Sequence, residues 1–265
     1  MTSHGVEIQS LSSGADAAGV AAYSPDGRYV VYAELVGGRS QLFTMNADGS
    51  NKHRLIHSEF ADTYPSYSPD GKWIVFARAY LHRSYSLGGS SWNDVDICLT
   101  PVDGTSCKRL TRSRFYGISA PYFSPDGRYI VFGGIPRSTG TGTFRAHIVL
   151  FDIRAVTANM LTEGQSIEYY PAFSPTGDRI VYVTNRGYDP HKPGGYEIWT
   201  MDLGGKNAEQ LTYLRKNLQA PYYFPDGKSI LFVVDLGDEN YELWRMDAEG
   251  KNLRRIAGPG VFSGH

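Results

Sequence analysis

The chain has 265 residues, a formal net charge of −1 and only 20% charged residues. This near-neutral balance lacks the basic signature that nucleic-acid binding requires, so we expect no nucleic-acid partner. A hydrophobic content of 41% can supply a sizeable core and argues against disorder. The 30 glycines, 14 prolines and 19 tyrosines indicate many turns between strands that are rich in aromatic residues.

No run of the sequence reaches the roughly 18–20 apolar residues that a membrane-spanning helix needs. Residues 1–7 contain neither the basic segment nor the apolar segment of a secretory signal peptide. The sequence as written therefore predicts a cytoplasmic protein. A periplasmic or secreted location is expected instead if the sequence is a mature fragment.

Two cysteines, Cys98 and Cys107, flank a turn at residues 102–104. Opposed positions of one hairpin can lie close together, but a disulfide demands a narrow geometry. Two half-buried thiols are the simpler expectation, and the redox compartment stays open.

One motif occurs five times and organises the chain. Its first copy is AYSPDGRYVVY at residues 22–32, and the others are residues 66–76, 122–132, 172–182 and 222–232. The copies follow one another at intervals of roughly 44 to 56 residues, which is typical of repeat architectures. Proline sets φ for the Ser-Pro-Asp-Gly turn, aspartate caps it through its side chain, and glycine takes the positive φ.

Each repeat predicts four strands. The first strand ends at the turn, and the second, such as residues 73–76, is apolar at its last three positions, which predicts that both its faces are covered. A third, alternating strand precedes a second hairpin, and a polar fourth strand closes the unit. The third strands are residues 41–45, 96–100, 147–151, 197–201 and 242–246, and the fourth are 53–56, 108–111, 159–162, 209–212 and 253–256.

Four antiparallel strands per repeat predict an all-β fold, a five-bladed β-propeller that forms a single domain over residues 1–265. The expected blades cover approximately residues 20–57, 63–112, 119–163, 169–213 and 219–258. Residues 6–12 precede the first blade, and we expect them to form a closing strand on the outside of blade five. An incomplete six-bladed ring is the alternative.

The repeats resemble the TolB-type (WD40-like) propeller repeat, as found in the C-terminal domain of TolB proteins. The matching residues are the aromatic residue, Ser-Pro-Asp-Gly and basic residue of residues 67–72, and the Arg-Leu-Thr of residues 109–111. The resemblance covers about residues 5–258 and is weakest at residues 151–156, where no Asp-Gly hairpin occurs. It implies a propeller but little about activity, because propellers host unrelated functions. The sequence has no Gly-x-Ser-x-Gly motif, so we expect no peptidase activity.

The long connections fall on one face of the predicted disc. The turns between first and second strands and between third and fourth strands are tight and share one face. The other face, here called the long-loop face, contains the loops between second and third strands. It also contains the crossings, which are the connections from the fourth strand of one blade to the first strand of the next. Its long loops are residues 78–94, 133–145 and 184–196. Function on a rigid scaffold concentrates in variable loops, so we expect the site here, around the mouth of the channel.

Charged residues on the long-loop face are unevenly distributed. The basic residues of its loops, strand ends and crossings are Arg78, His82, Arg83, Arg112, Arg114, Arg137, Arg145, His147, Arg186, His191, Lys192, Arg215 and Lys216. The acidic residues are Asp62, Asp94, Asp96, Glu168 and Asp189, with Asp235, Asp238 and Glu239 in blade five. A basic sector beside an acidic one predicts an anionic or zwitterionic ligand, or a complementary protein surface. Solvated loop charges without a ligand are the alternative.

Aromatic residues reinforce this interpretation, because tyrosine and tryptophan combined with arginine are typical of interface hot spots, and aromatic faces also stack on sugars. For Tyr64 and Tyr170, cross-blade packing is the alternative explanation. The candidate binding residues are Tyr64, His82, Arg83, Trp92, Tyr116, Arg145, Tyr169, Tyr170, Arg186 and Tyr188.

We therefore expect a monomeric binding or interaction module without a cofactor, which engages a protein partner or an anionic or carbohydrate ligand. The alternative is a small propeller enzyme, a lyase or hydrolase that acts on carbohydrate. The resemblance includes oligogalacturonate lyase, a metal-dependent relative in the wider family. His82, His147 and His191 come from consecutive blades and could converge on a divalent metal, although no His-x-x-x-His spacing supports such a site.

Overall fold

The structure, a computed structural model, describes residues 21–84, 90–112, 115–137, 144–187, 195–238 and 240–258, without the side chains at 83, 84 and 90–92. Every regular element in these ranges is a β-strand, which agrees with the all-β prediction. Within the described residues no helix is long and apolar enough to cross a membrane. Residues 6–12, the expected closing strand, lie outside the description.

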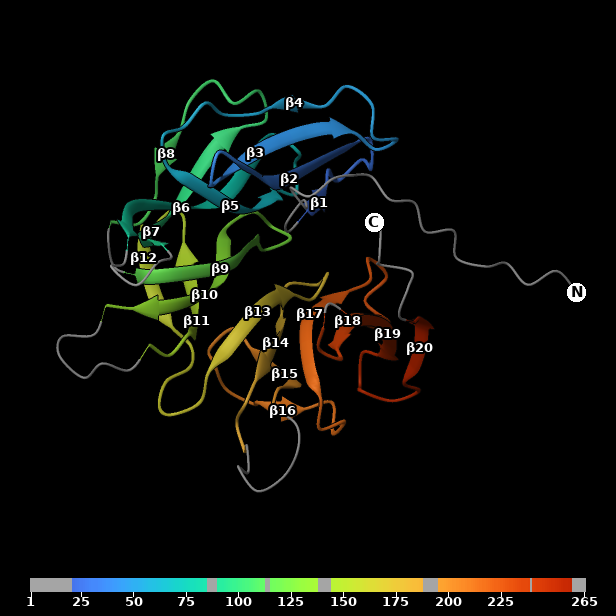
Figure 1. The fold of residues 1–265 in the computed structure, drawn as a ribbon. Helices are drawn as coiled ribbons and strands as arrows, with labels where there is room; N and C mark the ends of the chain where they lie inside the picture. The colour runs from blue at the N-terminus through green and yellow to red at the C-terminus, as the bar shows by residue number, and fades with distance from the viewer. Residues whose placement is uncertain are drawn as a thin grey trace, which may run out of the picture.

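The described strands form consecutive antiparallel groups of four, which we call sheets 1 to 5 (Figure 1). Sheet 1 contains β1 (Ala21–Tyr23), β2 (Tyr29–Val36), β3 (Arg39–Asn46) and β4 (His53–Arg54). Sheet 2 contains β5 (Ala61–Tyr67), β6 (Trp73–Ser84), β7 (Ser90–Pro101) and β8 (Lys108–Arg109). Sheet 3 contains β9 (Phe115–Phe123), β10 (Tyr129–Pro136), β11 (His147–Asp152) and β12 (Thr157–Met160).

Sheet 4 contains β13 (Glu168–Phe173), β14 (Arg179–Thr184), β15 (Glu197–Asp202) and β16 (Glu209–Gln210). Sheet 5 contains β17 (Asn217–Tyr223), β18 (Ser229–Asp235), β19 (Tyr241–Asp247) and β20 (Arg254–Ala257). Sheets 2 and 3 are additionally joined by one residue pair, Val95 with Phe115. This series of four-stranded antiparallel sheets is consistent with propeller blades.

The Ser-Pro-Asp-Gly turns have the geometry that their residues predict. In the first copy, the Ser24 hydroxyl donates to Asp26 Oδ1 at 2.7 Å and accepts a hydrogen bond from the Tyr29 amide at 2.9 Å. Gly27 has a φ of +70°, which a side chain would strain. In the fourth copy threonine replaces the aspartate, and Asp178 two residues later accepts the serine hydroxyl instead. The prediction of an aspartate-capped turn is confirmed.

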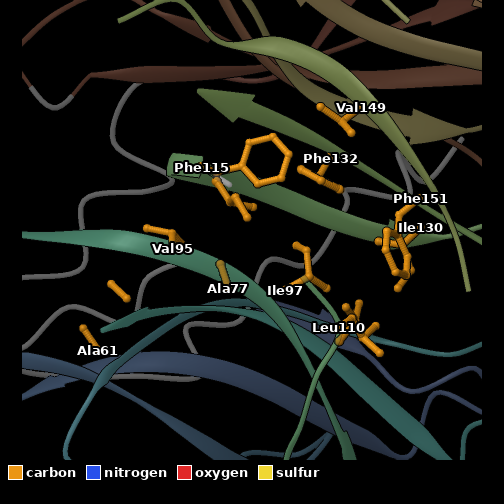
Figure 2. Packing of buried hydrophobic residues seen from close by; sticks show 13 residues of the cluster. Ala61, Ala77, Val95, Ile97, Leu110, Phe115, Ile130, Phe132, Val149 and Phe151 are labelled. Carbon is orange, nitrogen blue, oxygen red and sulfur yellow. The ribbon is translucent and has the colours of Figure 1, made fainter. Parts of the chain in front are cut away.

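Apolar side chains fill the space between neighbouring sheets. The repeat position occupied by Val31, Val75, Val131 and Val181 is completely buried in each of sheets 1 to 4. Between sheets 2 and 3, the rings of Phe115 and Phe132 pack edge to face at a centroid distance of 5.2 Å (Figure 2). The second strands are therefore covered on both faces, as their apolar runs predict.

The first strands of sheets 2 to 5 lie at the centre, because β5 packs on β9, β9 on β13, and β13 on β17. Each has a bulge at the residue before its proline, with positive φ at Tyr64 (53°), Ala120 (46°), Tyr170 (50°) and Ala220 (46°). Bulges of this kind re-aim a side chain away from the regular pleat. The repeat thus places one specially oriented residue per sheet at the centre.

Sheet 5 differs from the others in how its outer face is covered. Leu231 and Val233 are only partly buried, whereas Val181 and Val183, their counterparts in sheet 4, are 0% and 1% exposed. No described strand of sheet 5 packs on sheet 1 with contacts comparable to those between other neighbouring sheets. The described part of the chain is therefore open between its first and last sheets (Figure 1).

The prediction of a long loop at residues 78–94 is wrong. Here β6 and β7 extend to 12 residues each, and their pairing continues from Trp73 with Pro101 to Ser84 with Ser90. Arg78 is a charged residue at the start of this predicted loop, but within the fold it pairs with Asp62 of the neighbouring strand.

Candidate functional site

Half-buried tyrosines gather at the centre of the molecule. We call Tyr64, Tyr169, Tyr170 and Tyr196 the tyrosine cluster. The ring of Tyr169 lies 6.1 Å from that of Tyr170 and 6.0 Å from that of Tyr196. Tyr64 comes from sheet 2, and its phenol influences both Tyr169 and Tyr170 electrostatically. The bulges at Tyr64 and Tyr170 contribute to this convergence.

Burial raises the pKa of all four phenols, and neighbouring tyrosines add to the effect at Tyr169 and Tyr170. The hydroxyls therefore stay protonated around neutral pH, where each can donate one hydrogen bond and accept others. The cluster offers aromatic faces and uncharged polar tips to a bound group. This combination is typical of interface anchors.

A cavity of about 730 Å³ adjoins the cluster between sheets 4 and 5. We call it the sheet 4–5 groove, and it is lined by Asn185, Gly195, Tyr196, Arg215, Lys216, Asn217, Asp235, Leu236 and Gly237. These residues lie at or just beyond the ends of β14 and β18 and at or just before the starts of β15 and β17, so the groove opens on the long-loop face. Tyr196 belongs to both features and joins them into one candidate site.

Backbone contacts hold the crossing that forms one wall of the groove. The Arg215 amide donates to the Glu197 carboxylate, and Arg215 itself has a φ of +54°. A parallel bridge joins Tyr196 to Asn217. The wall is therefore anchored to the first residue of β15 while its side chains remain exposed.

The groove carries more positive than negative charge. Among the described residues, neither the Arg215 guanidinium nor the Lys216 ammonium forms an ion pair, and Lys216 lies 5.9 Å over the Trp244 ring. Asp235 is the acidic residue in the lining, and it accepts hydrogen bonds from the Gly237 amide at 2.8 Å and Gln219 at 3.0 Å. These contacts satisfy part of its charge, so the groove suits a ligand that carries carboxylates.

The structure brings together only some of the predicted binding residues. Tyr64, Tyr169 and Tyr170 meet in the tyrosine cluster. Tyr116 packs on Phe144 at 4.5 Å, and Arg145 donates to the Gln165 carbonyl, so both make local contacts around sheet 3. His82 is exposed on β6.

The remaining candidates lie elsewhere in the fold or outside the described residues and side chains. The Arg186 guanidinium lies 5.2 Å over the Trp199 ring of sheet 4. Arg83 and Trp92 belong to β6 and β7, but their side chains lie outside the description. Tyr188 and His191 also lie outside the described residues.

Internal ion pairs neutralise several charges that the sequence suggested for ligand binding. Arg78 pairs with Asp62, and Arg109 with Asp96. Arg137 pairs with Asp94, which removes a further cation from the predicted basic sector. Fewer of the cations on the long-loop face are therefore available to a ligand than its composition indicates.

His147, one of the three candidate metal ligands, is 7% exposed, and its Nδ1 lies 2.8 Å from Glu168 Oε2. Glu168 also accepts a hydrogen bond from Thr162 at 3.0 Å. Across the described ranges, no three His, Cys, Asp or Glu residues are grouped so that they could hold a metal ion. The three-histidine site stays a prediction, because His191 falls outside those ranges.

Sequence reasoning missed Tyr196 and Asn217 as site residues. Arg215 and Lys216 were noted as crossing cations but not selected as binding residues. Tyr196 directly precedes β15, so in the sequence it looks like the last residue of a loop. Its bridge to Asn217 forms only because sheets 4 and 5 pack side by side. The one signal in the sequence that pointed to this groove was the pair of adjacent cations, Arg215 and Lys216, in a crossing.

Comparisons with known proteins agree with this fold. The family model described as the TolB beta propeller domain matches residues 79–263. The chain is 30% identical over 156 residues to the uncharacterized protein Atu1656 of Agrobacterium fabrum, covering 57% of this chain and 51% of that protein. It is 27% identical over 178 residues to the Tol-Pal system protein TolB of Gluconobacter oxydans, covering 67% of this chain and 36% of that protein.

The matches span about half or less of these relatives' length. Among solved structures, TolB of Acinetobacter baumannii superimposes with a TM-score of 0.70 at 19% identity, covering 94% of this chain and 57% of that one. At this level of identity the superposition shows a shared fold.

Proposed function

The chain belongs to the TolB beta propeller domain family, and from that premise we propose that it is a binding module for a protein partner. The partner presents a segment with carboxylates to the sheet 4–5 groove and the adjoining tyrosine cluster. The observation that carries this proposal is the groove itself, in which Tyr196 stands beside Arg215 and Lys216.

Size and chemistry support a peptide-like occupant. A volume of about 730 Å³ falls in the range of roughly 300–1,000 Å³ that is typical of ligand clefts. The two cations complement carboxylates, and the amides of Asn185 and Asn217 can pair with a partner's backbone. Tyrosine and arginine are enriched among residues that dominate binding energy. One of the relatives is itself described as a Tol-Pal system protein.

The experiment measures binding of a fluorescent oligoglutamate peptide, with oligolysine of equal length as the opposite-charge probe. The double variant Arg215→Glu with Lys216→Glu should lose roughly tenfold or more in affinity for oligoglutamate, because two attractive charges become repulsive. The loss should shrink as salt is added, since exposed charges are screened.

A matched control is Lys228→Glu, which reverses an exposed charge on the first-to-second turn of sheet 5, on the opposite face. It should leave oligoglutamate binding unchanged. A loss of binding free energy in the control half as large as that in the groove variant would mean that only overall charge matters, because the control reverses one charge and the groove variant two. Weakening by Arg186→Glu alone would instead place the site beside Trp199 of sheet 4, over whose ring the Arg186 guanidinium lies.

We further propose that sheets 1 to 5 are successive blades of one domain with the boundaries expected from the repeats. The exposed outer face of sheet 5 supports a ring that is open beside this sheet within the described chain, as an incomplete six-bladed ring would be.

A further inference from the structure

Two free cysteines lie on one face of sheet 2. Cys98 is 0% exposed in β7, and Cys107 is exposed just before β8. In the β7–β8 pairing, Cys98 is opposite Arg109. Because side chains alternate along a strand, Cys107 lies on the same face as Arg109 and is a diagonal neighbour of Cys98. Backbone pairing therefore holds a buried thiol beside an accessible one.

A buried cation points at the accessible sulfur. The Arg78 guanidinium, 7% exposed, uses Nε and Nη2 to bind both oxygens of Asp62, at 2.6 and 2.8 Å. Its remaining terminal nitrogen, Nη1, donates to Cys107 Sγ at 3.3 Å. Asp62 thus fixes the orientation of the guanidinium, and Nη1 is left to stabilise negative charge on Cys107.

Tyr80 and Arg109 lie around the buried sulfur of Cys98. The Tyr80 hydroxyl lies 3.4 Å from Cys98 Sγ, and the Arg109 guanidinium covers the Tyr80 ring at 4.2 Å. The pKa of Cys107 is lowered to about 7 by a hydrogen bond from the Cys98 thiol and by the charge of Arg78. Burial and the Asp62 charge act in the opposite direction but are weaker. The same hydrogen bond, together with burial, raises the pKa of Cys98. As the pH rises through neutrality, the first proton of the pair therefore leaves Cys107, and Cys98 keeps its own.

We propose that Cys107 is an oxidation site for hydroperoxides and that Cys98 is its resolving thiol, so that the two cysteines close a reversible disulfide. The Cys107 thiolate attacks the distal oxygen of the hydroperoxide, which forms an S–O bond, breaks the O–O bond and releases an alcohol or water after protonation. The Cys98 sulfur then gives up its proton and attacks the Cys107 sulfur, which forms the S–S bond and expels hydroxide as water. Two thiols supply the two electrons that reduce the peroxide, and a small dithiol reverses the reaction.

The first experiment treats the folded, reduced full chain with a slight excess of hydrogen peroxide and analyses it by mass spectrometry. No lysine or arginine lies between residues 84 and 107, so trypsin releases both cysteines in the single peptide 84–108. We expect this peptide to lose the mass of two hydrogen atoms and to regain it after reduction by a dithiol. A peptide that stays reduced, or gains only oxygen, overturns the proposal.

Two single variants separate the roles of the cysteines. Cys98→Ser should stop at the sulfenic acid of Cys107, which dimedone traps. Cys107→Ser should leave Cys98 unmodified in the folded chain, because Cys98 is buried. The opposite pattern, with oxidation at Cys98 in the absence of Cys107, contradicts the assignment.

The pH dependence of iodoacetamide alkylation provides a test in unmodified protein. In the folded chain the midpoint for Cys107 should lie near the lowered pKa of about 7. In denaturant, where Arg78 and Cys98 no longer contact it, the midpoint should rise to the ordinary thiol value of roughly 8.5. Identical midpoints in the two states would show that Arg78 and Cys98 do not activate Cys107, and would overturn the proposal.

Discussion

Arg78 and Asp62 form a two-point ion pair inside the fold, between the first and second strands of sheet 2. The Asp62 side chain is 0% exposed and the Arg78 side chain 9% exposed. The Arg78 guanidinium also lies 5.6 Å from the Phe60 ring, just before β5, and 5.2 Å from the Phe76 ring within its own strand. The pair thus holds β6 against β5. Asp62 lies two residues before Tyr64, which belongs to the tyrosine cluster.

Asp62→Asn should destabilise the protein strongly, because it leaves the Arg78 guanidinium buried without its counter-charge. Breaking one partner of a buried pair costs roughly 3–5 kcal/mol, which urea denaturation resolves easily. The exposed pair of Arg28 with Asp26 provides the control, and Arg28→Ala should leave the unfolding midpoint almost unchanged. Similar effects of the two substitutions would show that Asp62 and Arg78 are solvated rather than buried.

Glu168→Gln should have a pH-dependent cost. Burial acts to raise the pKa of Glu168, but hydrogen bonds from His147, Ser166 and Thr162 outweigh it, and the net pKa lies below the ordinary value. A lowered folded-state pKa means that the carboxylate stabilises the fold above the unfolded value of roughly 4.3. That contribution disappears as the pH falls through the folded-state pKa.

We therefore expect Glu168→Gln to lower the free energy of unfolding by about 1–3 kcal/mol at pH 7. Urea denaturation at several pH values should show the difference from the wild type shrinking below about pH 4. A difference that stays constant down to pH 3 would contradict the charged hydrogen-bond network around Glu168.

Threonines at the start of the crossings satisfy buried backbone amides. Thr212 Oγ1 accepts a hydrogen bond from the Ile198 amide at 2.9 Å, and Thr111 and Thr162 do the same for Ile97 and Ile148. Thr212→Val preserves shape but leaves that amide unpaired, which should cost about 1–3 kcal/mol in urea denaturation. Thr212→Ser keeps the hydroxyl and should recover most of the loss. Equal stability of the valine and serine variants would rule out this role.

Matched truncations in sheets 4 and 5 test whether sheet 5 lacks a neighbour. Val181 and Leu231 occupy the same repeat position, but Val181 is 0% exposed and Leu231 is partly exposed. Val181→Ala should cost about 2 kcal/mol or more. Leu231→Ala removes a larger side chain and yet should cost about 1 kcal/mol or less. The usual order, with the leucine change costing more, would mean that another part of the chain covers sheet 5.

Local chemistry explains why the repeat, its turns and its buried strands could be predicted. Residues 24–27 contain the proline, aspartate and glycine that their turn needs, and the runs at residues 74–76 show by composition that both strand faces are covered. Each of these features depends on residues within a few positions of one another. The assignment to strands and to the TolB-type repeat therefore required no knowledge of packing.

The candidate site depended on contacts that local patterns do not contain. Tyr64 and Tyr170 were predicted because each precedes a proline in a first strand, but Tyr196 joins them only through the packing of sheet 4. Arg78 looked like a loop cation, because its carboxylate partner lies 16 residues away.

The sequence alone determined the repeated unit, since a turn and an apolar run are defined by neighbouring residues. The tertiary structure decided which charges are neutralised and which remain available. Lys216 has no ion-pair partner among the described residues, whereas Arg78 is bound to Asp62. The structure also decided that Cys98 and Cys107 are adjacent to a buried guanidinium. These relationships depend on distances between strands, and long-range packing sets those distances.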